Sequence, residues 1–253
     1  MKYIESKKND EIKNVIKLSA TKNIKKTGTY VVEGFHLVRE ADLNNEEFVS
    51  LYVTTPNVGD RLVKKYHEIA TEISTEVATA ISETKNNQGI FAVIKINQPE
   101  EISSLSGQWV FLDNVQDPGN VGTIVRTADA AGFAGVISSP NSADFFQSKV
   151  QRAMQGSQFH LPIYKMNLDE AIDLAKDSGL HVYGSEVNSE AVPYNEIQKS
   201  DNFALIMGNE ANGMSQDLLD QTDDNVYIPI LGKAESLNVA IAAGILMYGL
   251  KGI

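Results

Sequence analysis

Three short segments carry polar side chains directly after a predicted strand, where α/β proteins bind ligands. In the first segment, Pro118 and Gly119 fit the two central positions of a type II turn, and Asn120 is a good N-cap for the helix that follows. Arg126 lies nearly two turns into that helix, so this segment is a candidate binding loop. The alternative is an ordinary strand-to-helix turn, with Arg126 paired to Asp129 on a wet surface.

The second and third segments have the same character. Gly208 lets a ligand approach the backbone closely, and Glu210 is an acid at a strand end and therefore near a cleft. Ser236 is a natural N-cap for the last helix, and Asn238 sits in its first turn with the side-chain amide free. Taken singly, a flexible Asn-Gly connector and simple helix capping explain these two segments.

The elements that position these segments alternate between strand and helix. The pattern predicts a small α/β domain at residues 1–97, a linker at 98–108 and a second α/β domain at 109–253. The predicted strands are 30–33, 49–54, 72–77, 90–96, 109–115, 135–138, 181–185, 203–207 and 226–230. Predicted helices start near residues 10, 35, 60, 77 and 237, and three others cover 120–132, 148–155 and 168–178. The helix that starts near residue 10 is expected to end at the polar stretch 21–29. The last helix is apolar all round, which predicts burial on every side and packing against a partner subunit.

Composition and charge narrow the classes of function. The chain has 253 residues, no cysteine and a net charge of −11. The absence of cysteine excludes thiolate zinc sites, iron–sulfur clusters and a thiol nucleophile, and it favours a cytoplasmic location. The first 40 residues hold nine basic and five acidic side chains, a net of +4 against −15 for the rest. This asymmetry suggests local contact with an anion, and an ordinary solvated helix face is an equally good interpretation.

Several common sites are missing from the sequence. The four histidines show no metal-ligand spacing, so no metal is predicted. The nucleophile elbow, the Walker loop and the dinucleotide glycine fingerprint do not occur, which disfavours a nucleotide-dependent oxidoreductase. The longest near-apolar run, 237–250, is 14 residues, and the start of the chain has no apolar signal-peptide core, so no membrane partner is expected.

Together and in this order, the three segments resemble the SpoU (TrmH-like) branch of the SPOUT methyltransferases, which transfer a methyl group from S-adenosylmethionine to ribose 2′-hydroxyls of RNA. The family motifs are similar to residues 117–129 (DPGNVGTIVRTAD), 207–214 (MGNEANGM) and 228–239 (IPILGKAESLNV). Residues 30–41 (YVVEGFHLVREA) look like the L30e-like substrate-binding domain that precedes many members. One departure lies at residues 152–156, which read RAMQG where the family often has RASMG.

The resemblance implies a fold, a cofactor and an assembly. The fold class would be α/β, with a small L30e-like α/β domain followed by a SPOUT domain that ends in a trefoil knot, a rare exception to the rule that chains do not thread loops. A homodimer would complete the active site. The cofactor, S-adenosylmethionine, would lie in the knot against Met207, Gly208, Ile228, Ile230 and Leu237.

The resemblance also assigns catalysis to Arg126, Asn120, Glu210, Ser236 and Asn238. Because a guanidinium stays protonated, we expect Arg126 to hold the phosphate beside the target ribose and to stabilise the forming alkoxide. The proton would leave through water or Glu210. Asn120, Ser236 and Asn238 would orient the arginine and the hydroxyl.

The predicted substrate is RNA, and 23S-type ribosomal RNA is preferred over transfer RNA by analogy. Lys22, Lys25, Lys26 and Arg152 would contact its phosphates. Two alternatives stay open, a transfer RNA 2′-O-methyltransferase and a non-catalytic RNA-binding protein that kept the fold. Binding of S-adenosylmethionine distinguishes the second alternative from an enzyme.

Overall fold

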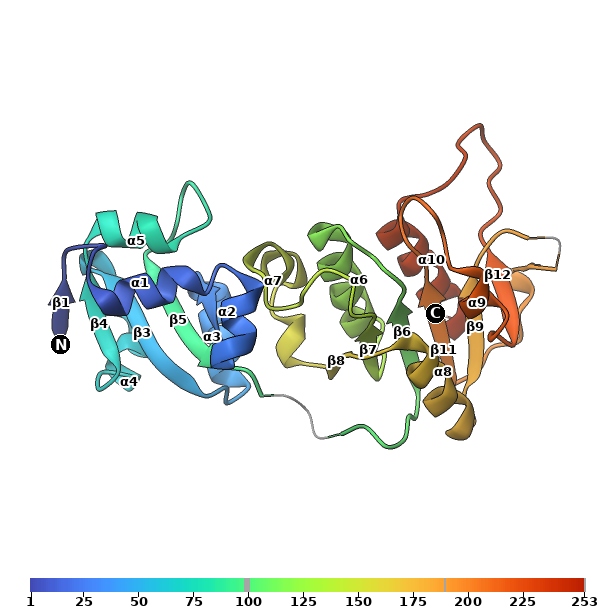
Figure 1. Ribbon diagram of the computed structural model, residues 1–253, viewed down its shortest axis with the longest axis horizontal. Helices are drawn as coiled ribbons and strands as arrows, with labels where there is room; N and C mark the ends of the chain where they lie inside the picture. Colours follow the sequence, from blue (N-terminus) through green and yellow to red (C-terminus); the bar gives the residue numbers. More distant parts are fainter. Residues whose placement is uncertain (98–100, 189, 253) are drawn as a thin grey trace. The chain divides into compact units, whose positions relative to one another are not determined.

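The computed structural model describes residues 1–97, 101–188 and 190–252, and packing divides the chain into two units. The first comprises Met1–Gln98 and Phe146–Phe159, and the second comprises Pro99–Phe145 and His160–Ile253. Each unit is built on a β-sheet with helices packed against it, so the predicted α/β class is confirmed (Figure 1). Of the predicted linker 98–108, residues 98–100 lie outside the described residues, and Gln108 already begins a strand.

The first unit has a mixed five-stranded sheet in the order β1-β4-β3-β5-β2. Its strands are β1 (Lys2–Ile4), β2 (Thr29–Glu33), β3 (Phe48–Thr54), β4 (Ala70–Ile73) and β5 (Ile90–Lys95). Its helices are α1 (Asp10–Lys17), α2 (Thr21–Thr27), α3 (Phe35–Leu43), η1 (Thr55–Asn57), α4 (Arg61–Lys65), α5 (Thr75–Ile81), α7 (Ser148–Met154) and η2 (Ser157–Phe159). Side chains alternate along β3, so Leu51 and Val53 pack in the core with α2, α3 and α4, and Tyr52 packs in the core with α1 and α5.

Two predictions for this unit are wrong. The strand expected at 72–77 ends at Ile73, because Ser74 caps α5 by accepting a hydrogen bond from the Val77 N–H (3.2 Å). The polar stretch 21–29, expected to end the first helix, forms α2 instead. That helix stops at Gly28, whose φ of +65° is a left-handed conformation that glycine adopts without strain.

Helix α7 follows β7 in the chain but packs within the first unit. The Gln151 side chain is 2% exposed and donates from Nε2 to the Val31 carbonyl (3.0 Å). Gln147, just before α7, donates from Nε2 to Thr21 Oγ1 at the start of α2 (3.0 Å). Arg152 on α7 is therefore carried by the same unit as the lysines of α2.

The second unit has a seven-stranded parallel sheet in the order β10-β12-β9-β11-β6-β7-β8. Its strands are β6 (Gln108–Leu112), β7 (Gly135–Ser138), β8 (Ile163–Lys165), β9 (His181–Ser185), β10 (Val192–Pro193), β11 (Phe203–Met207) and β12 (Asp224–Tyr227). Its helices are α6 (Pro118–Ala130), α8 (Leu168–Asp177), η3 (Tyr194–Glu196), α9 (Gln216–Leu219) and α10 (Val239–Lys251). Strands β1, β8 and β10 and helix α9 are not predicted from the sequence.

The central strands of this sheet are buried on both faces. Every residue of β6 and of β11 is buried, as expected for parallel strands covered by helices. Helices α8 and α9 pack in one core with these strands, and α10 packs against α6 and β11. Because all seven strands run parallel, the segments that follow β6, β9, β11 and β12 lie at one edge of the sheet. The trefoil knot stays a prediction.

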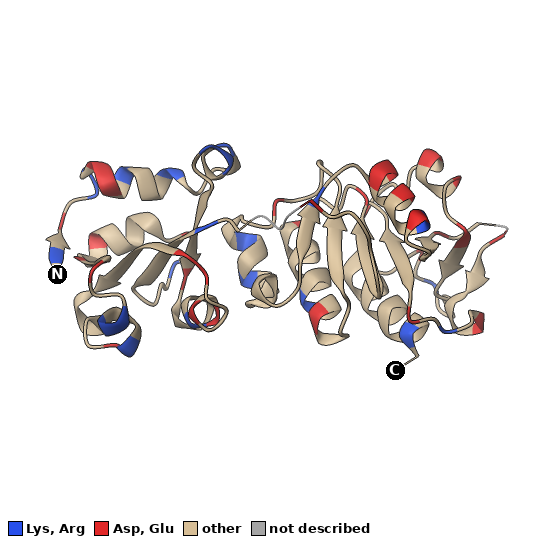
Figure 2. Ribbon diagram, turned by 90° about the horizontal axis from the view of Figure 1, so that it is seen from below, with Lys and Arg blue, Asp and Glu red and all other residues tan. Residues whose placement is uncertain are grey.

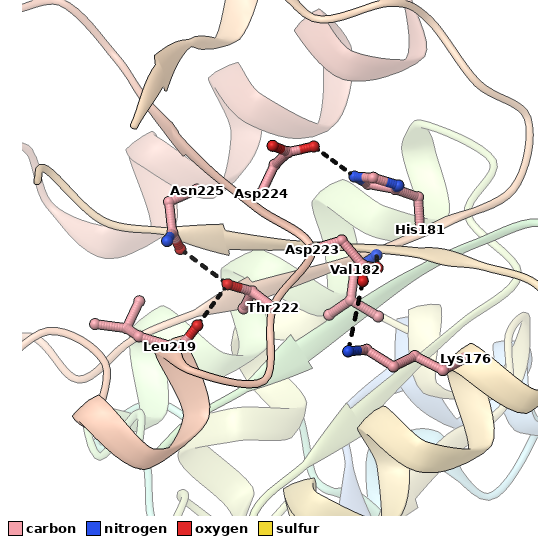
Figure 3. A network of polar contacts seen from close by, with 8 residues as sticks. All are labelled: Lys176, His181, Val182, Leu219, Thr222, Asp223, Asp224 and Asn225. Carbon is pink, nitrogen blue, oxygen red and sulfur yellow. Dashed lines mark hydrogen bonds and ion pairs between the residues drawn. The ribbon is translucent and has the colours of Figure 1, made fainter. Parts of the chain in front are cut away.

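Polar contacts at the opposite edge hold β9 and β12 together (Figure 3). The Asp223 carboxylate accepts a hydrogen bond from the Val182 N–H (2.8 Å), and His181 Nε2 lies 2.8 Å from the Asp224 carboxylate. Lys176 on α8 forms an ion pair with Asp223 (3.4 Å). These contacts fix the amino ends of two strands whose carboxyl ends lead into the candidate site.

Candidate functional site

The segment after β11 folds into a tight loop that closes on itself. Asn209 and Gly213 exchange two backbone hydrogen bonds, of 2.9 and 3.0 Å. A Cβ atom on Gly208 would lie 2.5 Å from the backbone of Gly213 and of Met214. The loop's own backbone therefore already requires glycine at this position, and the close approach of a ligand to Gly208 stays a prediction.

The Glu210 carboxylate holds the first segment against this loop. Its Oε2 accepts from the Gln116 N–H (3.1 Å), and its Oε1 accepts from the Asp117 N–H (3.0 Å) and from Asn120 Nδ2 (3.1 Å). Desolvation raises the pKa of Glu210, but hydrogen bonds from Asn120 and from backbone N–H groups outweigh it, so this pKa lies below its ordinary value. A weakly basic carboxylate whose two oxygens already accept hydrogen bonds is suited to positioning and poorly suited to accepting a proton.

Asn120 extends this connection to the third segment. Its Oδ1 accepts from Asn238 Nδ2 (3.0 Å), and Asn238 Oδ1 accepts from the N–H groups of Ala240 (2.9 Å) and Ile241 (3.3 Å). A carboxylate only accepts, so Asn120 must turn its NH₂ group toward Glu210 and its oxygen toward Asn238. One hydrogen-bond chain with a single direction thus joins the three segments and ends on the first turn of α10.

Two helix caps differ from the sequence predictions. The N-cap of α6 is Asp117 and not Asn120, since the Asp117 carboxylate accepts from two N–H groups at the start of the helix (2.7 and 3.1 Å). Pro118 is thus the first helical residue rather than part of a type II turn. The N-cap of α10 is Asn238 and not Ser236, which makes no hydrogen bond with the described part of the chain. Asn238 is preferred because its amide also reaches Asn120.

A pocket of about 280 Å³ opens between these segments and α10. All five residues predicted to hold the cofactor line it, namely Met207, Gly208, Ile228, Ile230 and Leu237. Its volume is close to the lower end of the range for small-molecule sites, about 300–1,000 Å³. The apolar side chains suit an adenine ring, and the carboxylate of Glu210 at the pocket suits a positively charged sulfonium. The residues present therefore fit S-adenosylmethionine.

Arg126 is not brought into this pocket by its own chain. It is exposed on α6, and it forms no hydrogen bond or ion pair with the described residues. The alternative pair with Asp129 is not formed, because the Asp129 carboxylate lies 2.8 Å from His160 Nδ1. The guanidinium is thus available for an outside ligand, and its predicted role stays a prediction.

Sequence reasoning missed two residues that hold the site together. Asn209 Nδ2 donates to the Asn114 carbonyl (2.7 Å), which ties the second segment to the first. Asp113 is 3% exposed, and its Oδ2 accepts from the Ser215 N–H (3.3 Å). Burial raises the pKa of Asp113, against hydrogen bonds from Ser215 and Asn114 that lower it. The sequence signal that could have found them is a short polar side chain within two residues of the end of a strand, Asp113 after β6 and Asn209 after β11.

The residues predicted to contact RNA all lie in the first unit, and Figure 2 marks lysine and arginine in blue. Lys22, Lys25 and Lys26 are exposed on α2 and form no ion pair within the described ranges, and Arg152 on α7 donates to Ser148 Oγ. In residues 1–97, 101–188 and 190–252, no group of three or more side chains is arranged to hold a metal ion. Within the same ranges, none of the helices has the length and apolar character needed to cross a membrane.

Known proteins match this chain over both units. The SpoU rRNA Methylase family matches residues 107–248, and the MRM3-like substrate binding domain matches residues 9–92. A Bacillus subtilis (strain 168) protein, 23S rRNA (guanosine(2553)-2'-O)-methyltransferase RlmP, is 42% identical over 100% of both chains. A putative TrmH family tRNA/rRNA methyltransferase of Staphylococcus aureus (strain MSSA476) is 30% identical over 86% of this chain and 94% of its own. The AdoMet-bound rRNA methyltransferase structure from Sinorhizobium meliloti has a TM-score of 0.90 and 31% identity, covering 99% of this chain and 97% of that one.

Proposed function

The chain belongs to the SpoU rRNA methylase family, and from this premise we propose that it methylates the ribose 2′-hydroxyl of one guanosine in 23S ribosomal RNA. The predicted enzyme class, an RNA 2′-O-ribose methyltransferase that uses S-adenosylmethionine, is confirmed by this membership. The observation that carries the choice of substrate is the full-length identity with the Bacillus subtilis enzyme named for guanosine 2553. The cytoplasmic location stays a prediction.

The residues of the pocket suit this reaction. When bound, S-adenosylmethionine supplies a methyl group on a positively charged sulfur. Attack by an alkoxide cancels charge, so the apolar walls formed by Ile228, Ile230 and Leu237 favour the reaction by excluding water. The chain from Glu210 through Asn120 to Asn238 keeps the polar groups in fixed orientations. Since Glu210 is a weak base, we assign proton removal to water and the anchoring of the neighbouring phosphate to Arg126.

The substrate is tested by complementation. This chain is expressed in a Bacillus subtilis strain that lacks its 42% identical relative, and 2′-O-methylation is mapped across 23S ribosomal RNA and transfer RNA. We expect the mark at guanosine 2553 to return with this chain and to stay absent with its Arg126→Ala variant. Methylation of transfer RNA only, or no mark despite soluble expression, contradicts the proposal.

We further propose that the active form is a homodimer. The prediction that α10 is buried on every side is wrong for the single chain, because Ile241 is 56% and Tyr248 is 38% exposed. These residues are spaced by two helical turns and form an apolar stripe on a helix that packs against α6. A second copy of this chain is the partner that we favour. It would cover this stripe, and it would bring its own Arg126 toward a pocket whose lining contains no arginine.

Disrupting the stripe tests the dimer. Ile241→Asp puts a charge in the proposed interface, so we expect the dimer to dissociate and methyl transfer to fall at least tenfold. Light scattering after size-exclusion chromatography measures the mass. Leu43→Asp is the matched control, since Leu43 is 72% exposed at the end of α3 and should leave both mass and activity unchanged. A wild-type protein that is active as a monomer contradicts the proposal.

We also propose that α2 contacts RNA phosphates. Lys25 and Lys26 are exposed and have no acidic partner among the described residues. Replacing both by glutamate is expected to weaken binding of a 23S fragment and to lower the slope of log K against log salt by about 2, since each phosphate contact contributes about 1. Filter binding at several salt concentrations measures this. The control is Lys64→Glu on α4, which changes the net charge by half as much. A loss half as large in this control would mean that only net charge matters and would contradict the assignment to α2.

A further inference from the structure

Glu186 is a pocket residue to which neither the sequence motifs nor the family matches give a role. It follows β9 directly, and its backbone N–H donates to the Val226 carbonyl of β12 (3.2 Å), which fixes its position at the site edge of the sheet. Its side chain lines the same pocket as the five residues predicted to hold the cofactor. A carboxylate at this place therefore faces whatever ligand the pocket holds.

The Glu186 carboxylate retains capacity to accept hydrogen bonds. Its Oε1 accepts from the Val187 N–H (3.0 Å), whereas Oε2 has no donor among the residues that the structure describes. Oε2 lies against Gly213, where a Cβ atom would come within 2.8 Å of it. Glu210 differs, because both of its oxygens are occupied by donors of the chain. Of these two carboxylates, only Glu186 has an oxygen left for a ligand.

The order of the strands indicates which part of the ligand Glu186 meets. Glu186 follows β9, which is separated from β6 by β11, so the two strands lie about 10 Å apart. Asn120 and Asn238, which handle the reacting hydroxyl in the proposed function, lie on the β6 side near α6 and α10. In the proposed function the methyl group lies near those residues. The opposite side of the pocket then receives either the nucleoside or the amino-acid half, and the apolar Val187 and Ile228, which line the same pocket as Glu186, favour the nucleoside.

On the basis of the proposed function, we propose that Glu186 Oε2 accepts hydrogen bonds from the ribose hydroxyls of S-adenosylmethionine. A diol supplies two neutral donors, and an acidic side chain at a strand end is a common acceptor for ribose in α/β folds. Glu186 is thus a cofactor-binding residue, and it sets the preference of the pocket for a ribonucleoside. The apolar residues beside it, Val187 and Ile228, suit the adjoining adenine.

Calorimetry on the full chain tests this assignment with three ligands. These are S-adenosylmethionine, 5′-methylthioadenosine, which lacks the amino-acid half, and the 2′,3′-dideoxy form of 5′-methylthioadenosine. Because a hydrogen bond to a charged acceptor is lost, Glu186→Ala should weaken binding of the first two ligands by the same factor, about tenfold. The dideoxy ligand should bind the variant and the wild type equally. Glu186→Gln should lose less, because its amide oxygen still accepts.

Glu190→Ala is the matched control, since Glu190 is exposed on the same connection and does not line the pocket. It should bind all three ligands as the wild type does. Unchanged affinity of Glu186→Ala for S-adenosylmethionine would overturn the assignment, as would a loss confined to the ligand that has an amino-acid half. Failure of the wild type to bind any of the three would overturn the proposed function, and this inference with it.

Discussion

Replacing Arg126 by alanine is expected to lower kcat by about two to three orders of magnitude, the usual effect of losing one group that stabilises developing negative charge. Arg126 is exposed and does not line the pocket. The affinity of the variant for S-adenosylmethionine and its unfolding temperature should therefore stay close to those of the wild type. Single-turnover methyl transfer to a 23S fragment measures the chemical step, and calorimetry measures cofactor binding. A variant that loses cofactor affinity instead would mean that Arg126 shapes the pocket.

The lysine variant separates two roles for the same side chain. Arg126→Lys keeps the charge but loses the planar pair of donors, and lysine gives up a proton more easily than arginine. If Arg126 anchors a phosphate, activity should fall at every pH. Activity that is retained and shifted along the pH axis would instead support a role as the base and would contradict our assignment.

Glu210→Gln is expected to have the second largest effect, on both activity and stability. A glutamine side chain offers only one acceptor oxygen, so its NH₂ group must face a donor that now meets Glu210, either the Gln116 N–H or the pair formed by the Asp117 N–H and Asn120. The chain to Asn238 then loses its fixed direction. Misplacement of reacting groups by about 1 Å can cost about 10²-fold, so we expect a fall in kcat of that order, with a lower unfolding temperature. Glu170→Gln on α8 is the matched control and should change neither quantity.

The stability effect of Glu210→Gln should depend on pH with a defined sign. Desolvation raises the pKa of Glu210, but the hydrogen bonds that it accepts lower it further, so the folded-state pKa lies below the ordinary value of 4.5. The carboxylate therefore contributes stability above about pH 4.5, and this contribution is lost as the pH falls through the folded-state pKa. The difference in unfolding temperature between wild type and variant should be full at pH 7 and should shrink below pH 4.5. A constant difference across this range would contradict the assigned hydrogen bonds.

Much of the second unit follows from the sequence, because its strands are apolar runs that end in short polar segments. The strands at 135–138, 181–185 and 203–207 have the predicted bounds, and the five predicted cofactor residues share one pocket. Local pattern was sufficient for 135–138 and 203–207, since every residue of these two strands is buried and their bounds are set by where the apolar run stops. The strands expected at 109–115 and 226–230 are wrong in their bounds, because they are found at Gln108–Leu112 and Asp224–Tyr227.

Local pattern was insufficient where a residue far away in the sequence determines which side chain caps a helix or where a helix packs. Asp117 and Asn120 are both good capping residues, and so are Ser236 and Asn238, so the sequence alone does not choose between them. The choice is made by Glu210, which takes the Asn120 amide and, through it, orients Asn238. Helix α7 is a similar case, since its span was predicted but its packing against β2 depends on Gln151, over a hundred residues from Val31.

A crystal structure of the chain with S-adenosylhomocysteine, the product form of the cofactor, tests the central claim most directly. Density for the ligand is expected in the pocket bounded by Met207, Ile228 and Leu237, with the Glu210 to Asn238 hydrogen bonds intact beside it. Arg126 of a second copy is expected at the open side of that pocket. Ligand bound elsewhere, or a pocket that stays closed to it at saturating concentration, would contradict the claim that the three segments form one cofactor site.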